Sequence, residues 1–227
     1  MLNFLFNVIY VIKIMSQFLV LQTQASKLWS IPDKVITPAS LAPCARTMSF
    51  KHFYTIGKIY AEITGRFCID HMSINAIPKD GEMLIFSKSP SFGYNLYATI
   101  ADIALDTAIS PTFYKNCDYY SWEDCYPQKI KHKILNLKEV KHGFKGGIVF
   151  VRNIGGTYFL YSFATKTDKE SFYHYAMAYK ELFLQMGDYC LQKLLPIYEQ
   201  YASNTLDEIL YFFKKNNTNF RPSLQVI

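Results

Sequence analysis

The sequence lacks the short motifs on which most enzymes depend. Its 227 residues contain no phosphate-binding glycine loop, nucleophile elbow or zinc pattern. A thiol–imidazole pair of Cys125 with His132 or His142 is the catalytic arrangement that the residues would permit. We expect neither an enzyme nor a bound cofactor or metal.

Cysteine is also scarce, and its spacing excludes a disulfide scaffold. None of the five cysteines forms a CxxC pair, and no histidine lies at metal-ligand spacing from them. The odd number favours reduced thiols in a cytoplasmic protein, with a Cys117–Cys125 pair as the alternative.

Charged residues make up only 19% of the chain, and the net charge is +6. Much of the positive excess lies between Lys129 and Lys145, where Glu139 is the only acidic residue. We interpret this run, which includes Lys138, as a solvated helix end and loop, and contact with an acidic partner is the alternative. The spacing is not that of a nucleic-acid-binding module.

Aromatic residues, in contrast, are abundant at 17%, and the apolar fraction is 50%. This composition predicts a folded domain with a sizeable core. Tyrosine and phenylalanine in such numbers also suit a pocket for an apolar ligand with a polar head. The length from about Met48 onward is enough for one domain.

The first segment is apolar, and Lys13 is the only charge in residues 1–25. It could be a membrane anchor, a secretory signal, or a segment outside the natural domain. Residues 26–47 contain three prolines and resemble a linker. We expect residues 1–47 to lie outside the domain.

Periodicity divides the first half of the domain into helices and strands. Apolar spacing predicts a helix over 49–64, and alternation predicts a strand within 66–77. The turn residues Pro78–Gly81 join it to a second strand over 82–87. A helix is predicted over 89–106, and the aromatic stretch 107–128 is predicted to be a loop that could wall a ligand.

The second half begins with a short helix over 123–135, interrupted near Pro127. Two strands follow, over 146–153 and 157–165, and both are apolar on both faces. Such strands belong in the middle of an antiparallel sheet covered by helices on each side, and the glycines between them suit a hairpin.

Asp168 is predicted to begin a long helix, with a kink or break at Pro196 and continuation to about Phe213. One stripe of this helix should pack against the sheet. Its residues are Phe172, Ala176, Tyr179, Phe183, Met186 and Cys190.

This order of elements, and above all the stretch HGFKGGIVFVRNIGGTYFLYSFAT (142–165), resembles the N-terminal sensor domain of LuxR-family quorum-sensing regulators. The resemblance covers about Phe50 to Tyr201. It implies an α+β fold, an α/β/α sandwich with a central antiparallel sheet of about five strands and PAS/GAF-like layering. It also implies that acyl-homoserine lactones bind between the sheet and one helical layer.

The family's pocket pattern is a Trp and a Tyr four residues apart, an Asp nine residues beyond the Tyr, and a second Trp further on. Tyr97, Asp106 and Trp122 match the last three members of this pattern. Gly93 occupies the position of the first Trp, and Thr107 follows Asp106 where the family usually has Pro.

The resemblance assigns each matching residue a contact with the ligand. Asp106 would accept the amide N–H, Trp122 would donate to the ring carbonyl, and Tyr97 would donate to the amide carbonyl. Such bonds stabilise binding only in a pocket that excludes water. Further candidates for the pocket wall are Phe92, Tyr94 and Ser162.

Only 227 − 201 = 26 residues follow Tyr201, too few for the family's helix-turn-helix domain, so we expect no direct nucleic-acid binding. The predicted domains are a sensor at 48–203 and a C-terminal helix and tail at 204–227. The expected ligand is a small apolar signal molecule with a polar head. The expected protein partner is a second copy of the chain, in a homodimer, or a related regulator, in a heterodimer. Alternatives are a ligand-free module that interferes with full-length regulators, and a sensor anchored to the membrane by residues 1–25.

Overall fold

The computed structural model describes residues 39–93, 107–202 and 206–216. The chain divides into two compact units, Met1–Ile36 and Thr37–Ile227, and all described residues belong to the second. Within these ranges no helix combines the length and the apolar character that crossing a membrane requires. The predicted segment at 1–25 lies outside the described residues, as does most of the predicted helix 89–106.

The centre of the fold is a sheet of six strands in the order β1-β3-β2-β6-β5-β4. The five strands β2 to β6 pair antiparallel, and β1 adds to β3 in parallel. This confirms the predicted α+β class with an antiparallel sheet and adds one strand to it. The strands are β1 (Ser40–Leu41), β2 (His71–Ile77), β3 (Glu82–Ser87), β4 (Tyr119–Ser121), β5 (Gly146–Ile154) and β6 (Thr157–Thr165).

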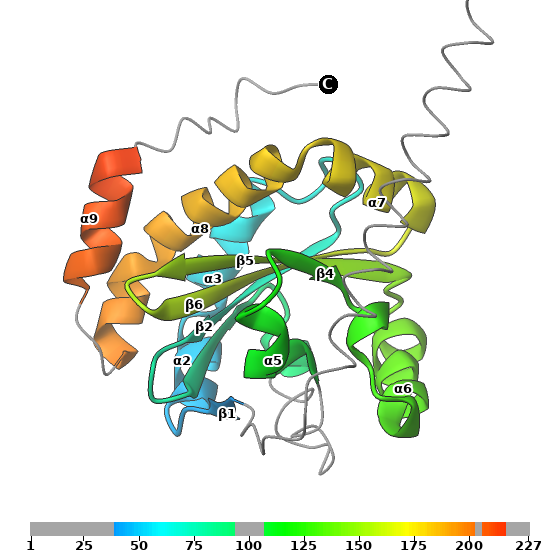
Figure 1. The fold of residues 1–227 in the computed structure, drawn as a ribbon, viewed down its shortest axis with the longest axis horizontal. Coiled ribbons are helices and arrows are strands. Elements are labelled where there is room, and N and C mark those ends of the chain that lie inside the picture. The colour runs from blue at the N-terminus through cyan, green and yellow to red at the C-terminus, as the bar shows by residue number, and fades with distance from the viewer. Residues whose placement is uncertain (1–38, 94–106, 203–205, 217–227) are drawn as a thin grey trace, which may run out of the picture. The chain divides into compact units, whose positions relative to one another are not determined.

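Helices cover both faces of the sheet. Figure 1 shows α7 and α8 on one side and α5 and α6 on the other, which is the predicted three-layer arrangement. The helices are α2 (Ala45–Lys51), α3 (Phe53–Ala61), α5 (Pro111–Tyr114), α6 (Gln128–Leu135), α7 (Lys169–Ala178), α8 (Lys180–Tyr201) and α9 (Asp207–Asn216), with short turns η2 (Thr107–Ile109), η3 (Glu123–Cys125) and the π-helical η4 (Asn136–Lys141).

The β5–β6 hairpin forms as predicted. Gly155 and Gly156 make its two-residue turn with φ values of 61° and 82°. Positive φ at both central residues matches the twist of the flanking strands and favours glycine. Both strands are largely buried, in agreement with a position inside the sheet.

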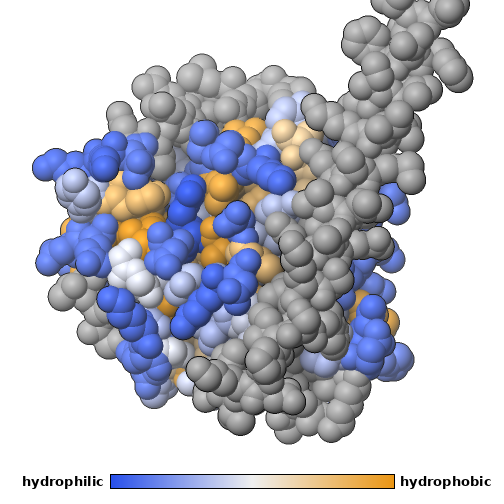
Figure 2. All heavy atoms as spheres, viewed as in Figure 1, coloured by the Kyte–Doolittle hydropathy of each residue, from blue (hydrophilic) through white to orange (hydrophobic). Residues whose placement is uncertain are grey.

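The main core lies on only one face of the sheet. Ile148, Phe150 and Tyr161 point into it and meet α3, α7 and α8, with α9 at the edge. Because side chains alternate along a strand, Val149, Leu160 and Ser162 point to the opposite face. On the side of the molecule in Figure 2, apolar side chains reach the surface in small patches between hydrophilic ones.

A buried polar group inside this core joins α8 to the sheet. The Tyr161 hydroxyl donates to Asp188 Oδ1 at 2.7 Å, and Arg152 Nη2 donates to Asp188 Oδ2 at 2.7 Å. Burial, and next the Asp188 carboxylate, raise the pKa of Tyr161 well above its usual range. The ring of Tyr161 lies against the backbone of Gly187, so α8 approaches the sheet closely here.

The N-terminal boundary and helices of the domain differ from the prediction. Strand β1 and the start of α2 precede Met48, where we placed the domain boundary, because Ala42 and Ala45 are buried in the main core. The predicted helix over 49–64 is divided into α2 and α3 at His52.

The predicted break at Pro196 is wrong. Pro196 lies inside α8, and the long helix is interrupted at Tyr179, whose side chain is 45% exposed and leaves the predicted stripe. A proline costs a helix interior about 3 kcal/mol. Buried Leu194, Ile197 and Tyr198 surround it, and burying three such side chains outweighs that cost.

Replacing Gly187 by alanine should destabilise the domain by about 1–3 kcal/mol, because the new methyl would lie 2.0 Å from Tyr161 Cδ2. The matched control is Gly57→Ala in α3, where nothing lies within 4 Å of the added methyl. The control should stabilise by up to about 1 kcal/mol through helix propensity. Urea denaturation measures both, and equal effects would contradict the close helix–sheet contact.

Candidate functional site on the second face of the sheet

The second face of the sheet carries a row of hydroxyl groups. Ser87, Ser73 and Ser162 are direct neighbours on β3, β2 and β6, and Val149 continues the row on β5. Ser87 and Ser162 are buried. Buried hydroxyls on an otherwise closed sheet face require partners, since an unsatisfied one costs free energy. This face therefore differs in chemistry from the main core.

Trp122 covers this row from the turn after β4. Its backbone N–H donates to the carbonyl of Gly147 at 2.9 Å, and its indole Nε1 donates to Ser162 Oγ at 2.9 Å. The indole lies directly on Gly147, where an added methyl would come within 2.2 Å of Trp122 Cδ2. The glycine pair at 146–147 thus makes room for the tryptophan.

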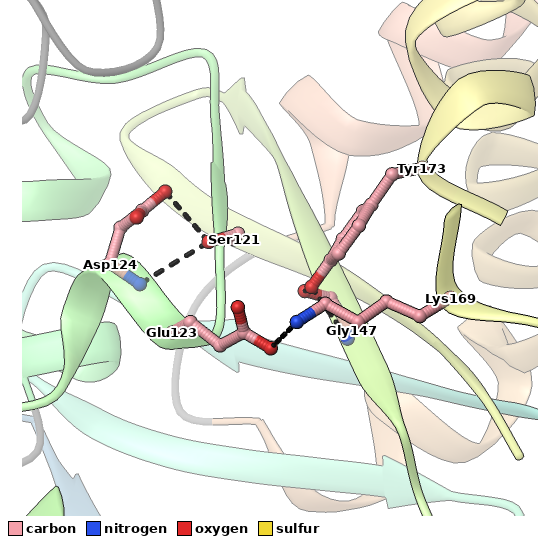
Figure 3. A network of polar contacts seen from close by, with 6 residues as sticks. All are labelled: Ser121, Glu123, Asp124, Gly147, Lys169 and Tyr173. Carbon is pink, nitrogen blue, oxygen red and sulfur yellow. Dashed lines mark hydrogen bonds and ion pairs between the residues drawn. The ribbon is translucent and has the colours of Figure 1, made fainter. Parts of the chain in front are cut away.

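Side chains of β4, η3 and α7 hold the turn that carries Trp122 in place (Figure 3). Ser121 Oγ donates to Asp124 Oδ2 at 2.7 Å, and Lys169 forms an ion pair with Glu123. Tyr173 of α7 accepts from the N–H of Gly147 at 3.2 Å and donates to its carbonyl at 3.1 Å. Gly147 is therefore held between Tyr173 and Trp122.

A small cavity lies between the serine row and the covering layer. It measures about 30 Å³. A water molecule requires roughly 10–15 Å³, whereas ligand pockets measure roughly 300–1,000 Å³. A ligand would therefore have to displace side chains of the covering layer. The lining residues are Ser73, Asn75, Ile85, Phe92, Gly93, Ala108, Tyr120, Trp122, Lys138, Val149, Leu160 and Ser162.

A buried lysine forms part of this lining. Lys138 is only 4% exposed, and its ammonium lies 3.8 Å from the centre of the Trp122 ring and 4.5 Å from that of Tyr126. It also donates a hydrogen bond to the Tyr126 hydroxyl. The interpretation of the basic run as a solvated helix end is wrong for this residue, because the π-helical turn η4 directs it inward.

His71 is buried on the same face, at the end of β2. It is 2% exposed, and its Nε2 has no hydrogen-bond partner among the described residues. Burial, and then the positive charges of Lys88, Lys166, His142 and Lys138, lower its pKa to about 3. His71 is therefore neutral at pH 7, with an unused polar atom inside the protein.

Three of the predicted site residues come together here. Phe92, Trp122 and Ser162 all line the cavity, and the last two are hydrogen-bonded to each other. The other three, Tyr94, Tyr97 and Asp106, lie outside the described residues. Gly93, where the family pattern has a Trp, also lines the cavity, and a methyl added to it would lie 3.1 Å from Ile85 Cγ2 and from Ser87 Cβ.

Several lining residues were not predicted from the sequence. Strand β4, which supplies Tyr120, lies in the stretch predicted to be a loop. Tyr120 donates to the carbonyl of Ala108 at 2.6 Å, and both residues line the cavity. Alternation along β2 puts Ser73 and Asn75 on the same face of the strand. Which face of the sheet that is depends on the pairing of β2 with β6, which the sequence does not show.

No group of three metal-ligating side chains gathers anywhere in the part of the chain that the structure describes. All five cysteines are free thiols. Cys125 donates to the carbonyl of Ser121 at 3.1 Å.

The chain is similar to two solved structures of the protein SdiA. One is a crystal structure of Escherichia coli SdiA, with 15% identity, a TM-score of 0.46, and 75% of this chain and 78% of that chain covered. The other is SdiA in complex with octanoyl-rac-glycerol, with 10% identity, a TM-score of 0.40, and 90% of this chain and 78% of that chain covered. No family model and no curated protein matches the sequence.

Replacing Gly147 by alanine should displace the Trp122 ring and shift its fluorescence to the red. Trp29, the other tryptophan, is replaced by phenylalanine so that only Trp122 emits. Gly146→Ala is the matched control, because its methyl would meet Lys169 and Tyr173 at 3.1 Å on the other side of the sheet. Identical emission spectra for the two variants would contradict the packing of Trp122 on Gly147.

His71 should make the domain sensitive to acid. The unfolded chain binds a proton at His71 below about pH 6.5, whereas the folded chain does so only below about 3. Stability should fall as the pH drops through this window, by about 2 kcal/mol from His71 at pH 5. Urea denaturation at pH 8 and pH 5 measures the loss.

His71→Leu should flatten this pH dependence, and His132→Leu, at an exposed position, should leave it unchanged. Equal slopes in both variants would show that His71 is not held neutral by the fold.

Proposed function

We propose that this chain is a small-molecule sensor domain of the LuxR type. The ligand is an acyl-homoserine lactone or a related molecule with an apolar chain and a polar head. The observation that carries the proposal is the second face of the sheet, where Trp122, Ser162 and Phe92 converge on one cavity. The sequence match of Trp122 to the family's pocket pattern supports it independently.

The Trp122–Ser162 hydrogen bond explains how a polar head would be received. In the described state the indole N–H is satisfied by Ser162 Oγ at 2.9 Å. A ligand carbonyl placed between them can accept from the indole N–H and from the serine hydroxyl. The exchange keeps each donor satisfied, so that opening the site does not leave a buried polar group unpaired.

The apolar chain would lie along the aliphatic part of the same face. Ile85, Val149 and Leu160 line the cavity beside the hydroxyl row. At roughly 25 cal/mol per Å² of apolar surface, burying an eight-carbon chain stabilises the complex by several kcal/mol. The gain offsets the rearrangement needed to enlarge a cavity of about 30 Å³.

Thermal unfolding with N-octanoyl-homoserine lactone or octanoylglycerol tests the proposal. At a ligand concentration of 100 times Kd, binding should stabilise the folded chain by about 2.7 kcal/mol. Homoserine lactone without the acyl chain should leave the melting temperature unchanged. If neither long-chain ligand shifts the melting temperature, the sensor function is wrong, and a ligand-free interaction module becomes the better account.

A pair of variants locates the binding face. Trp122→Phe removes the indole donor and should weaken binding about tenfold, the equivalent of one hydrogen bond. Tyr161→Phe removes a buried donor from the opposite face and should lower stability but leave Kd unchanged. Titration calorimetry measures both, and the reverse order would place the ligand in the main core.

A further inference from the structure

We propose that the ligand site continues past Phe92 to His71, and that its ligand carries an oxygen-bearing group, without positive charge, that hydrogen-bonds to His71 Nε2. This inference rests on the proposed function and adds one contact and one chemical requirement to it. Its evidence is the position of His71 and the arrangement of the rings around it.

One buried nitrogen of His71 has no hydrogen-bond partner among the described residues. The atom is Nε2, and the residue is 2% exposed. Buried polar atoms in native proteins are nearly always hydrogen-bonded, because leaving one unsatisfied costs stability. A role in binding accounts for a histidine at a position where an apolar residue would fold better.

Among the described residues, Phe92 connects His71 to the cavity. Phe92 lines the cavity, and its ring centre lies 5.5 Å from that of His71. The same ring lies 4.6 Å from His142 and 5.2 Å from Phe144. A ligand that displaces Phe92 therefore gains the volume of one aromatic ring and reaches His71.

The register of the sheet places His71 on the same face as the serine row. His71 lies two residues before Ser73 on β2, so both side chains point to the same face. Ala164 is its neighbour on β6, and Gly147 is the next residue across on β5. Because both residues are small, β5 and β6 place no large side chain of their own between His71 and the Trp122 indole.

The charges around His71 select the ligand's head group. Lys88, Lys166 and Lys138 place positive charge near it. An ammonium head would be repelled there, whereas a carbonyl, hydroxyl or carboxylate oxygen would be attracted. Neutral imidazole can donate to a carbonyl or accept from a hydroxyl, so either oxygen group can pair with Nε2.

A cavity created by replacing Phe92 with alanine tests the proposed contact with His71 without the signal molecule. Phe92→Ala should open a ring-sized space that binds phenol and toluene, two probes of nearly equal size. Phenol can hydrogen-bond to His71, and toluene cannot. His71→Leu in the same background keeps the volume and removes the hydrogen bond. The ratio of the toluene Kd to the phenol Kd, measured by NMR titration, should fall at least fivefold in the double variant.

An unchanged ratio would overturn the inference, and so would a folded Phe92→Ala variant that binds neither probe. If Phe92→Ala does not fold, Phe92→Leu takes its place. In the unmodified chain, addition of N-octanoyl-homoserine lactone should also shift the ¹⁵N resonance of His71 Nε2, and a lactone that binds without this shift counts against the inference.

The phenol comparison and the lactone binding together distinguish a failure of the His71 contact from a failure of the proposed function. Phenol selectivity that depends on His71, together with no binding of the lactone, would support the extended site and overturn the proposed ligand class. Lactone binding that is equal in the unmodified chain and in His71→Leu, with an unchanged phenol ratio, would leave the sensor function standing and remove His71 from it.

Discussion

The packing of the Trp122 indole on the bare backbone of Gly147 is the contact on which the candidate site depends. It is possible only because position 147 has no side chain, and Tyr173 holds the same peptide from the opposite side. With the ring fixed there, its N–H reaches Ser162, and Lys138 lies over its face. The second face of the sheet therefore carries polar groups, whereas the first face packs in the main core.

The face of the sheet that packs in the main core stabilises the fold, and the second face carries the polar side chains of the candidate site. On the first, Tyr161, Asp188 and the half-buried Arg152 form one hydrogen-bonded network beside a continuous apolar core. On the second, hydroxyl and ammonium groups line a cavity of about 30 Å³, and the His71 imidazole is buried nearby against Phe92. Under the proposed function, internal hydrogen bonds on this face are exchanged for bonds to a ligand while the opposite face keeps the fold intact.

The sequence predicted the strands better than their surroundings. The β5–β6 hairpin followed from its glycines and two apolar runs, and Asp168 is the N-cap of α7 as expected. The sequence could not show that Pro196 would stay helical, since that depends on the buried residues around it. Strand β4 was missed because three residues are too short for an alternating pattern. The burial of Lys138 was missed because a π-helical turn has no simple sequence signal.

The central claim is that a ligand binds on the Ser162 face of the sheet, and the alternation of the strands provides an internal control for it. Val149 and Leu160 point to that face, and their neighbours Ile148 and Phe159 point to the main core. The most direct measurement is a set of NMR contacts between N-octanoyl-homoserine lactone and the methyl groups of selectively labelled protein. Our account predicts contacts from the ligand chain to Val149 and Leu160 and none to Ile148. Contacts to Ile148, or to neither set, would contradict it.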